Sequence, residues 1–117
     1  MPAFNFKKQF APDVESGKKH QTIRSKRKNR PQVGQTAYLY TGMRTKACRK
    51  LGEAEITAVQ NVNITFSGVT IDSGPELYMP DNVNQFARDD GFKNWHFILA
   101  WFDKTHGLPF EGDLIKW

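Results

Sequence analysis

The chain has 117 residues, a formal net charge of +5 and a single cysteine, Cys48. This length predicts one domain over residues 1–117 with a real hydrophobic core. One thiol excludes an internal disulfide, and His20, His96 and His106 lack the spacing of metal ligands, so we expect no metal and no cofactor. No apolar run approaches a membrane span, and the N-terminus lacks the apolar core of a signal peptide, which predicts a cytoplasmic protein with no membrane partner.

Most of the chain predicts strands. Residue types favoured in strands, with partial alternation, predict extended segments at Ala3–Phe6, 21–25, Thr36–Thr41, 48–57, 59–66, 69–71 and 108–117. Ser67-Gly68 predicts a hairpin between two of these strands, and Ser73-Gly74-Pro75 predicts a turn.

Three short helices complete the pattern. Phe10, Ala11 and Val14 form one apolar face within residues 7–16, and Gly17 suits a left-handed helix end. Two later helices are predicted to begin after capping residues at Asp81 and Asn94. Their apolar faces are formed by Val83, Phe86 and Ala87 in the first helix, and by Trp95, Ile98, Leu99 and Phe102 in the second.

This order of elements predicts an α+β fold. We expect a small, mostly antiparallel β-barrel flanked by three or so helices. A barrel of this size has no room for a large internal cavity. A functional site should therefore lie in a cleft between the barrel and the helices.

The basic residues are gathered in one part of the sequence. No acid occurs between Glu15 and Glu53, whereas this interval holds eleven cations: Lys18, Lys19, Arg24, Lys26, Arg27, Lys28, Arg30, Arg44, Lys46, Arg49 and Lys50. The rest of the chain has six cations against twelve acids. Such clustering indicates an electropositive face for phosphates, nucleotides or RNA, although a solvated basic loop has the same composition.

The segment Gly17-Lys18-Lys19-His20-Gln21-Thr22-Ile23-Arg24 concentrates cations around a hydroxyl. In an extended strand Thr22 and Arg24 share one face, and Lys19 lies at the turn that enters the strand. Burial and the neighbouring cations Lys18 and Arg24 would lower the pKa of Lys19, and a neutral amine can accept a proton. The segment therefore predicts an anion-binding or acid–base site.

The same segment resembles the Gly-x-Lys-x-x-Thr-x-Arg signature of the ASCH family, which belongs to the PUA-like superfold of small β-barrels associated with RNA. Val33-Gly34-Gln35-Thr36-Ala37 is similar to the family's Val-Gly-Asp strand entry, with Gln35 where Asp is usual. Phe86-Ala87-Arg88-Asp89-Asp90-Gly91-Phe92 is similar to the segment usually written Ala-x-x-Glu-Gly-Phe. The helix from Asn94 and the closing Phe110-Glu111-Gly112 to Trp117 are also of the family's kind, so the resemblance covers nearly the whole chain.

Some bacterial members of this family are amidohydrolases that remove the acetyl group from N4-acetylcytidine with a Lys, a Thr and a Glu. By motif position, the resemblance implies Lys19 as base, Thr22 as nucleophile and Asp90 as the acid or the group that orients Lys19. Asp90 is a departure from Glu and is one methylene shorter. A displacement near 1 Å can cost on the order of 100-fold in rate.

Three functions remain open from the sequence. The first is binding of RNA or a modified nucleoside or nucleotide, and its candidate contacts are Lys18, His20, Arg24, Lys26, Arg27 and Arg44. The second is deacylation of an N4-acetylcytidine-like nucleoside, and the third is a metal-independent ribonuclease. Four aromatic side chains could stack on a base, although each also suits the core: Tyr38, Tyr40, Tyr78 and Trp95.

Overall fold

The structure is a computed structural model that describes residues 2–72, 77–78 and 83–117. Its strands within these residues are β1 (Ala3–Phe6), β2 (Gln21–Arg24), β3 (Thr36–Thr41), β4 (Arg49–Glu55), β5 (Ala58–Thr65), β6 (Gly68–Asp72), β7 (Leu77–Tyr78) and β8 (Phe110–Lys116). The helices are α1 (Ala11–Ser16), α2 (Val83–Asp89) and α3 (Trp95–Thr105). Every strand and helix expected from the sequence is present, and β7 is an addition.

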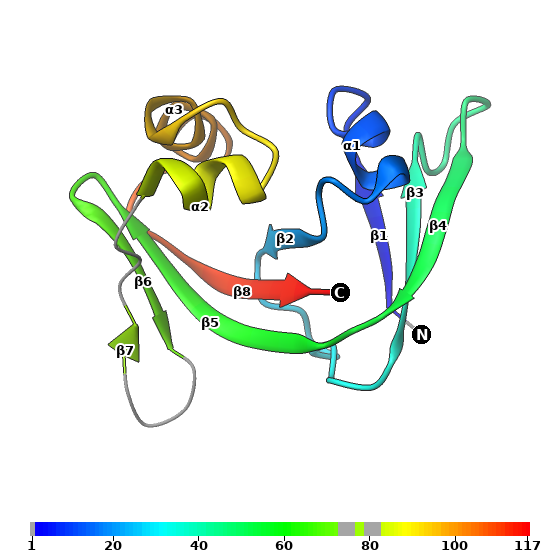
Figure 1. Cartoon of the computed structure of the whole chain (residues 1–117), viewed down its shortest axis with the longest axis horizontal. Helices are drawn as coiled ribbons and strands as arrows, with labels where there is room; N and C mark the ends of the chain where they lie inside the picture. The colour runs from blue at the N-terminus through cyan, green and yellow to red at the C-terminus, as the bar shows by residue number, and fades with distance from the viewer. Residues whose placement is uncertain (1, 73–76, 79–82) are drawn as a thin grey trace.

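The strands form two sheets. One has three strands in the order β1-β3-β4, and the other has five in the order β2-β8-β5-β6-β7. The chain passes from one sheet to the other between β4 and β5, which follow each other along one bent ribbon (Figure 1). All pairs are antiparallel except β1 with β3, which is parallel. The prediction of a mostly antiparallel α+β fold is therefore confirmed.

In the described part of the chain, the strands of the expected β-barrel do not close into a barrel. β1 pairs only with β3, and β2 pairs only with β8, among the described residues. No backbone hydrogen-bond ladder between strands therefore joins the two sheets there. Side chains bridge β1 and the β2 segment instead. Arg24 donates from Nη2 to the carbonyl of Asn5 at 2.8 Å, and Arg27 donates from Nη2 to the carbonyl of Ala3 at 3.0 Å. Backbone acceptors of β1 are thus satisfied by guanidinium groups.

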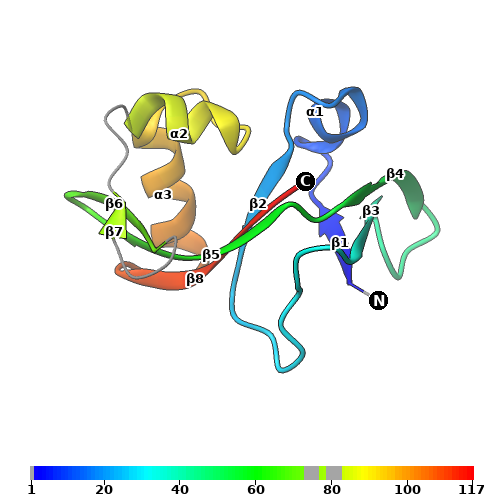
Figure 2. The ribbon, with the colours of Figure 1, turned by 60° about the horizontal axis from the view of Figure 1, so that its bottom comes forward.

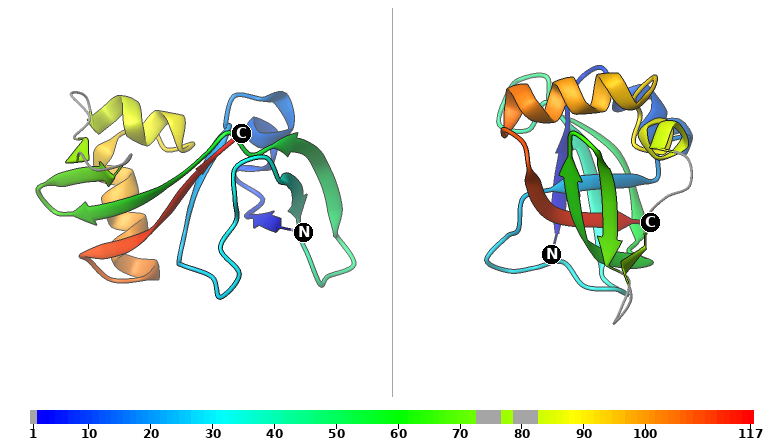
Figure 3. Two further views of the ribbon diagram at one scale, coloured as in Figure 1. Left: turned by 90° about the horizontal axis from the view of Figure 1, so that it is seen from below. Right: turned by 90° about the vertical axis from the view of Figure 1, so that its left-hand side faces the viewer.

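There are two hydrophobic cores, one on the five-stranded sheet and one mainly on the three-stranded sheet, to which Ile115 of β8 also contributes. Helices α2 and α3 cover the five-stranded sheet, and α1 lies against the three-stranded sheet (Figures 2 and 3). Phe102 of α3 and Leu114 of β8 are fully buried in the first core, and Phe4 of β1 is fully buried in the second. Phe92 packs against both cores. The segment that follows α2 therefore lies where the two hydrophobic cores meet.

Capping residues set the helix ends largely as expected. Helix α1 begins at Ala11, later than the predicted residue 7, and Gly17 ends it with φ of 86°. Asn94 caps α3 by accepting a hydrogen bond from the Phe97 amide at 3.2 Å. The predicted cap at Asp81 and the predicted turn at Ser73-Gly74-Pro75 lie outside the described residues.

Candidate functional site

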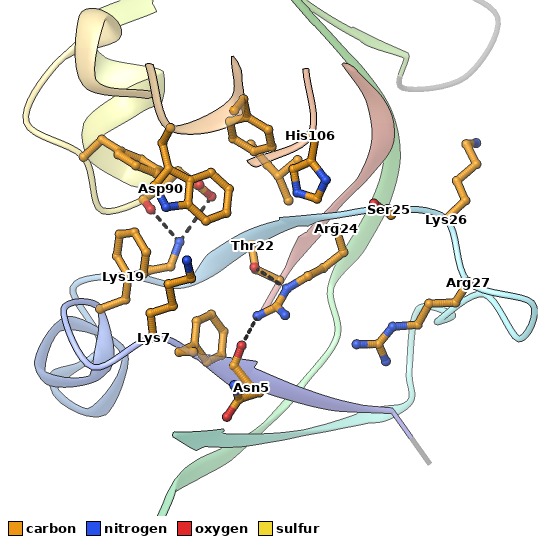
Figure 4. Close-up of a pocket in the computed structure, with 16 residues that line it drawn as sticks. Asn5, Lys7, Lys19, Thr22, Arg24, Ser25, Lys26, Arg27, Asp90 and His106 are labelled. Atoms are coloured by element: carbon orange, nitrogen blue, oxygen red, sulfur yellow. Dashed lines mark hydrogen bonds and ion pairs between the residues drawn. The ribbon is translucent and has the colours of Figure 1, made fainter. Parts of the chain in front are cut away.

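A pocket of about 520 Å³ lies where the two cores meet. Its apolar lining is formed by Phe6, Phe10, Ile23, Phe92, Trp101 and Phe102. Its polar lining is formed by Asn5, Lys7, Lys19, Thr22, Arg24, Ser25, Lys26, Arg27, Asp90 and His106. Figure 4 shows side chains from β1, β2 and the end of α2 converging on this space. Apolar walls with a few convergent polar groups are typical of a small-molecule site.

Lys19 is placed in the pocket by the turn between α1 and β2. Gly17 reverses the chain after α1, and the Lys19 amide then donates to the carbonyl of Asp13 at 2.9 Å. The Lys19 side chain enters the interior, where the residue is only 3% exposed. Its Nζ lies 5.2 Å from the ring centroid of Phe10 and 5.8 Å from that of Phe6. The ammonium group is therefore largely shielded from water by aromatic rings.

Asp90 holds Lys19 with two different oxygen atoms. Lys19 Nζ donates to the Asp90 backbone carbonyl at 2.5 Å, and it lies 3.3 Å from Asp90 Oδ1. Gln21 Nε2 donates to the same Oδ1 at 3.5 Å. The expected meeting of Lys19 and Asp90 is therefore present, with the shorter aspartate side chain in place of glutamate.

Gly91 permits this close approach. Its φ is +92°, a conformation that glycine adopts without strain. A Cβ atom at this position would lie 3.0 Å from Phe10 Cδ1 and 3.1 Å from Lys19 Cδ. The Asp90-Gly91-Phe92 turn thus needs glycine both for its backbone angle and for the room that Lys19 occupies.

Burial shifts both members of this pair toward their neutral forms. It lowers the pKa of Lys19, an effect that the Asp90 carboxylate opposes. It raises the pKa of Asp90, an effect that the Lys19 ammonium opposes. A lysine that more readily loses its proton and an aspartate that more readily keeps one are suited to base and acid roles.

Thr22 and Arg24 lie on one face of β2, as the alternation predicted. Arg24 Nε donates to Thr22 Oγ1 at 2.9 Å, and the Arg24 guanidinium carbon lies 4.9 Å from the Phe6 ring centroid. Burial, followed by the nearby Arg27 charge, lowers the pKa of Arg24 to about 10. The arginine fixes the threonine hydroxyl and still carries its charge at neutral pH.

Other predicted contacts are divided between the pocket and the surface. Lys26 and Arg27 line the pocket, whereas Lys18, His20 and Arg44 are exposed and do not. His20 precedes β2, and its carbonyl accepts a hydrogen bond from the Trp117 amide.

The aromatic side chains predicted to stack on a base do not line the pocket. Tyr38 and Tyr40 lie on β3, and Trp95 packs against the first core. The side chain of Tyr78 lies outside the described part of the chain. The aromatic walls are instead those of Phe6, Phe10, Phe92, Trp101 and Phe102.

Several residues at the site were not predicted. Lys7 lines the pocket, and its Nζ lies 5.3 Å from the Trp101 ring centroid. His106 also lines the pocket at the end of α3, with its ring centroid 4.8 Å from that of Phe110. Gln21 would face away from Thr22 by alternation, yet its side chain reaches Asp90. No sequence signal marks these contacts, because each depends on how the two halves of the chain pack together.

Within residues 2–72, 77–78 and 83–117, no cluster of His, Cys, Asp and Glu side chains could hold a metal ion. No helix in the described part of the chain has the length and apolar character needed to cross a membrane.

Comparison of the chain with family models, curated proteins and solved structures found no significant match.

Proposed function

We propose that this pocket is the active site of an amidohydrolase that removes the acyl group from an N4-acetylcytidine-like compound, on an ASCH domain of PUA-like fold. The single observation that carries the proposal is the buried Lys19–Asp90 pair, which lines the same pocket as Thr22. These are the residues that the sequence resemblance implies for this chemistry.

Stability alone does not explain why Lys19 and Asp90 are buried as a charged pair. Removing two charges from water costs several kcal/mol per ion, and well-packed apolar residues often stabilise such a position equally well or better. Buried pairs with shifted pKa values that line a cleft are candidates for function. Lys19 and Asp90 are 3% and 4% exposed, and both line the pocket.

The pocket has room and walls for a nucleoside. Its volume of about 520 Å³ lies within the range of ligand sites, which is roughly 300–1,000 Å³. Phe10, Phe92 and Trp101 supply aromatic surface against which a planar pyrimidine can pack. Polar groups for recognition and chemistry enter from β2 and from the end of α2.

In the proposed reaction, the neutral Lys19 amine takes the proton of the Thr22 hydroxyl as its oxygen attacks the acyl carbonyl carbon. Arg24 Nε, which donates to Thr22 Oγ1 at 2.9 Å, stabilises negative charge on that oxygen. The C–N bond breaks and the leaving amine takes a proton from Asp90 or from the Lys19 ammonium. Water then hydrolyses the threonine ester, releasing the carboxylic acid and restoring the hydroxyl.

The test is incubation of the purified protein with N4-acetylcytidine and chromatographic measurement of cytidine. Thr22→Val keeps the size of the side chain while removing the hydroxyl, so it should abolish turnover. Thr36→Val is the matched control, because Thr36 is an exposed strand residue that does not line the pocket. Equal cytidine release by the wild type and Thr22→Val would contradict the assigned nucleophile, and no release by the wild type would contradict the activity.

Binding of RNA is the second candidate, and the presence of Lys26 and Arg27 at the same pocket favours it. A complex held by phosphate contacts weakens steeply as salt increases, whereas hydrolysis of an uncharged nucleoside does not. Measuring RNA binding and nucleoside hydrolysis as a function of salt separates the two functions.

The ribonuclease hypothesis predicts RNA cleavage that persists in the presence of a chelator, and gel analysis of the RNA would detect this cleavage.

A further inference from the structure

Arg24 and Arg27 both line the pocket, and each contacts the ring of Phe4. Their guanidinium carbons lie 5.5 and 4.5 Å, respectively, from the same ring centroid, that of Phe4. Among the described residues, neither arginine forms an ion pair with a carboxylate. Like charges at one pocket repel each other, and an anion bound there would relieve this repulsion.

The two arginines are also held in place before any ligand binds. Both donate from Nη2 to carbonyls of β1, Arg24 to Asn5 and Arg27 to Ala3. A guanidinium group has five N–H donors, so each arginine retains donors beyond these contacts. Side chains ordered in this way lose less conformational entropy on binding a phosphate group.

The pocket carries more positive charge than the binding of an uncharged nucleoside requires. Its lining includes one acid, Asp90, and five basic residues: Lys7, Lys19, Arg24, Lys26 and Arg27. Lys19 already contacts Asp90 and Lys26 Nζ lies 3.9 Å from Asp113 Oδ1, which leaves Lys7, Arg24 and Arg27 without an ion pair among the described residues. Arg27 also lines a second pocket of about 350 Å³, whose described lining contains Asn29 and Arg30 and no acid.

We propose that Arg27, together with Arg24, binds a phosphate ester of the ligand, so that the site prefers a phosphorylated nucleoside over the free nucleoside. The identity of the base rests on the proposed function, whereas the phosphate contact rests on the two arginines. The phosphate can belong to a mononucleotide or to the backbone of RNA, since both offer the same oxygen acceptors to a guanidinium fork.

Calorimetric titration with cytidine and with cytidine 5′-monophosphate tests this proposal without requiring turnover. The wild type should bind the nucleotide at least about tenfold more tightly than the nucleoside, as expected for hydrogen bonds to a charged group. Arg27→Gln should weaken binding of the nucleotide more than binding of cytidine, and so remove most of this difference. Arg49→Gln is the matched control, because Arg49 is an exposed residue paired with Glu15 and lines neither pocket.

Equal affinity of the wild type for cytidine and for the nucleotide would overturn the proposal. It would also be overturned if Arg27→Gln weakened the binding of both ligands equally, or if the nucleotide did not bind at millimolar concentration. A short oligocytidine RNA forms a third arm. Tighter binding of the oligomer than of the mononucleotide would assign the phosphate to RNA, and equal binding would assign it to a mononucleotide. Nucleotide binding that depends on Arg27 without deacylation of N4-acetylcytidine would support this inference while contradicting the proposed function.

Discussion

The Lys19 ammonium lies 3.3 Å from the Asp90 carboxylate, although the two residues are 71 positions apart in the chain. Lys19 follows α1, which lies against the three-stranded sheet, and Asp90 follows α2, which covers the five-stranded sheet. The contact therefore joins the two halves at the pocket. It also places an amine and a carboxyl group with oppositely shifted pKa values in one site.

Replacing both members of this pair by apolar residues should separate stability from activity. Lys19→Met alone leaves the Asp90 charge buried without its partner and should lower the free energy of unfolding by about 3–5 kcal/mol. The double variant Lys19→Met/Asp90→Leu removes both charges and should recover most of this loss, while remaining inactive. Urea unfolding of the single and double variants measures the recovery, and a double variant less stable than the single one would contradict it.

Lengthening Asp90 to glutamate, the residue of the signature that this segment resembles, should be unfavourable in this chain. Asp90→Glu adds a methylene group to a side chain that is only 6% exposed. Overpacking of this kind typically costs about 1–3 kcal/mol, so we expect a lower free energy of unfolding and reduced deacylation. Asp89→Glu, at the neighbouring and less buried position, should change stability by less than about 0.5 kcal/mol. Higher activity in Asp90→Glu would show that the pocket accommodates the longer acid.

Gly91→Ala should damage the site more than an alanine at a similar backbone angle elsewhere. Gly34 has φ of +93°, but a Cβ there meets nothing within 4 Å, whereas one at Gly91 meets Phe10 and Lys19. Both substitutions should cost about 1–2 kcal/mol for the left-handed backbone. Gly91→Ala should also displace Lys19 and lower the rate by up to about 100-fold. Thermal unfolding and deacylation assays on both variants check this, and equal rates in the two would show that the Lys19 position is not critical.

The pH dependence of the reaction should move when Asp90 loses its charge. If neutral Lys19 is the base, kcat/KM rises with pH and levels off below 10.5, because burial lowers the Lys19 pKa. The Asp90 carboxylate raises that pKa, so Asp90→Asn should shift the rising limb to lower pH even if the maximal rate falls. Asp103→Asn, an exposed substitution on α3, should leave the limb in place. An unchanged limb in Asp90→Asn would exclude Lys19 as the titrating base.

The sequence was most informative where local spacing determines structure. Alternation placed Thr22 and Arg24 on one face of β2, and the caps at Gly17 and Asn94 match the observed ends of α1 and α3. These features depend on a few consecutive residues, so the sequence of one protein is enough to predict them. The Lys19–Asp90 contact was expected only through a family resemblance, since no local rule joins residues so far apart.

What the sequence did not indicate depends on packing between distant elements. Alternation cannot choose strand partners, so neither the parallel pairing of β1 with β3 nor the open seam between β1 and β2 was predicted. The same limit applies to the basic segment. Its charges appeared equivalent in the sequence, but the fold directs Arg27 into the pocket, pairs Arg30 with buried Asp113 at 2.9 Å and leaves Arg44 at the surface.

The most direct test of the active-site assignment compares cytidine release from N4-acetylcytidine by the wild type and by Lys19→Met/Asp90→Leu, after circular dichroism has shown that both are folded. The proposed chemistry predicts steady release by the wild type and none above background by the folded double variant. Release by both proteins, or by neither, would contradict the assignment of this pocket as an amidohydrolase site.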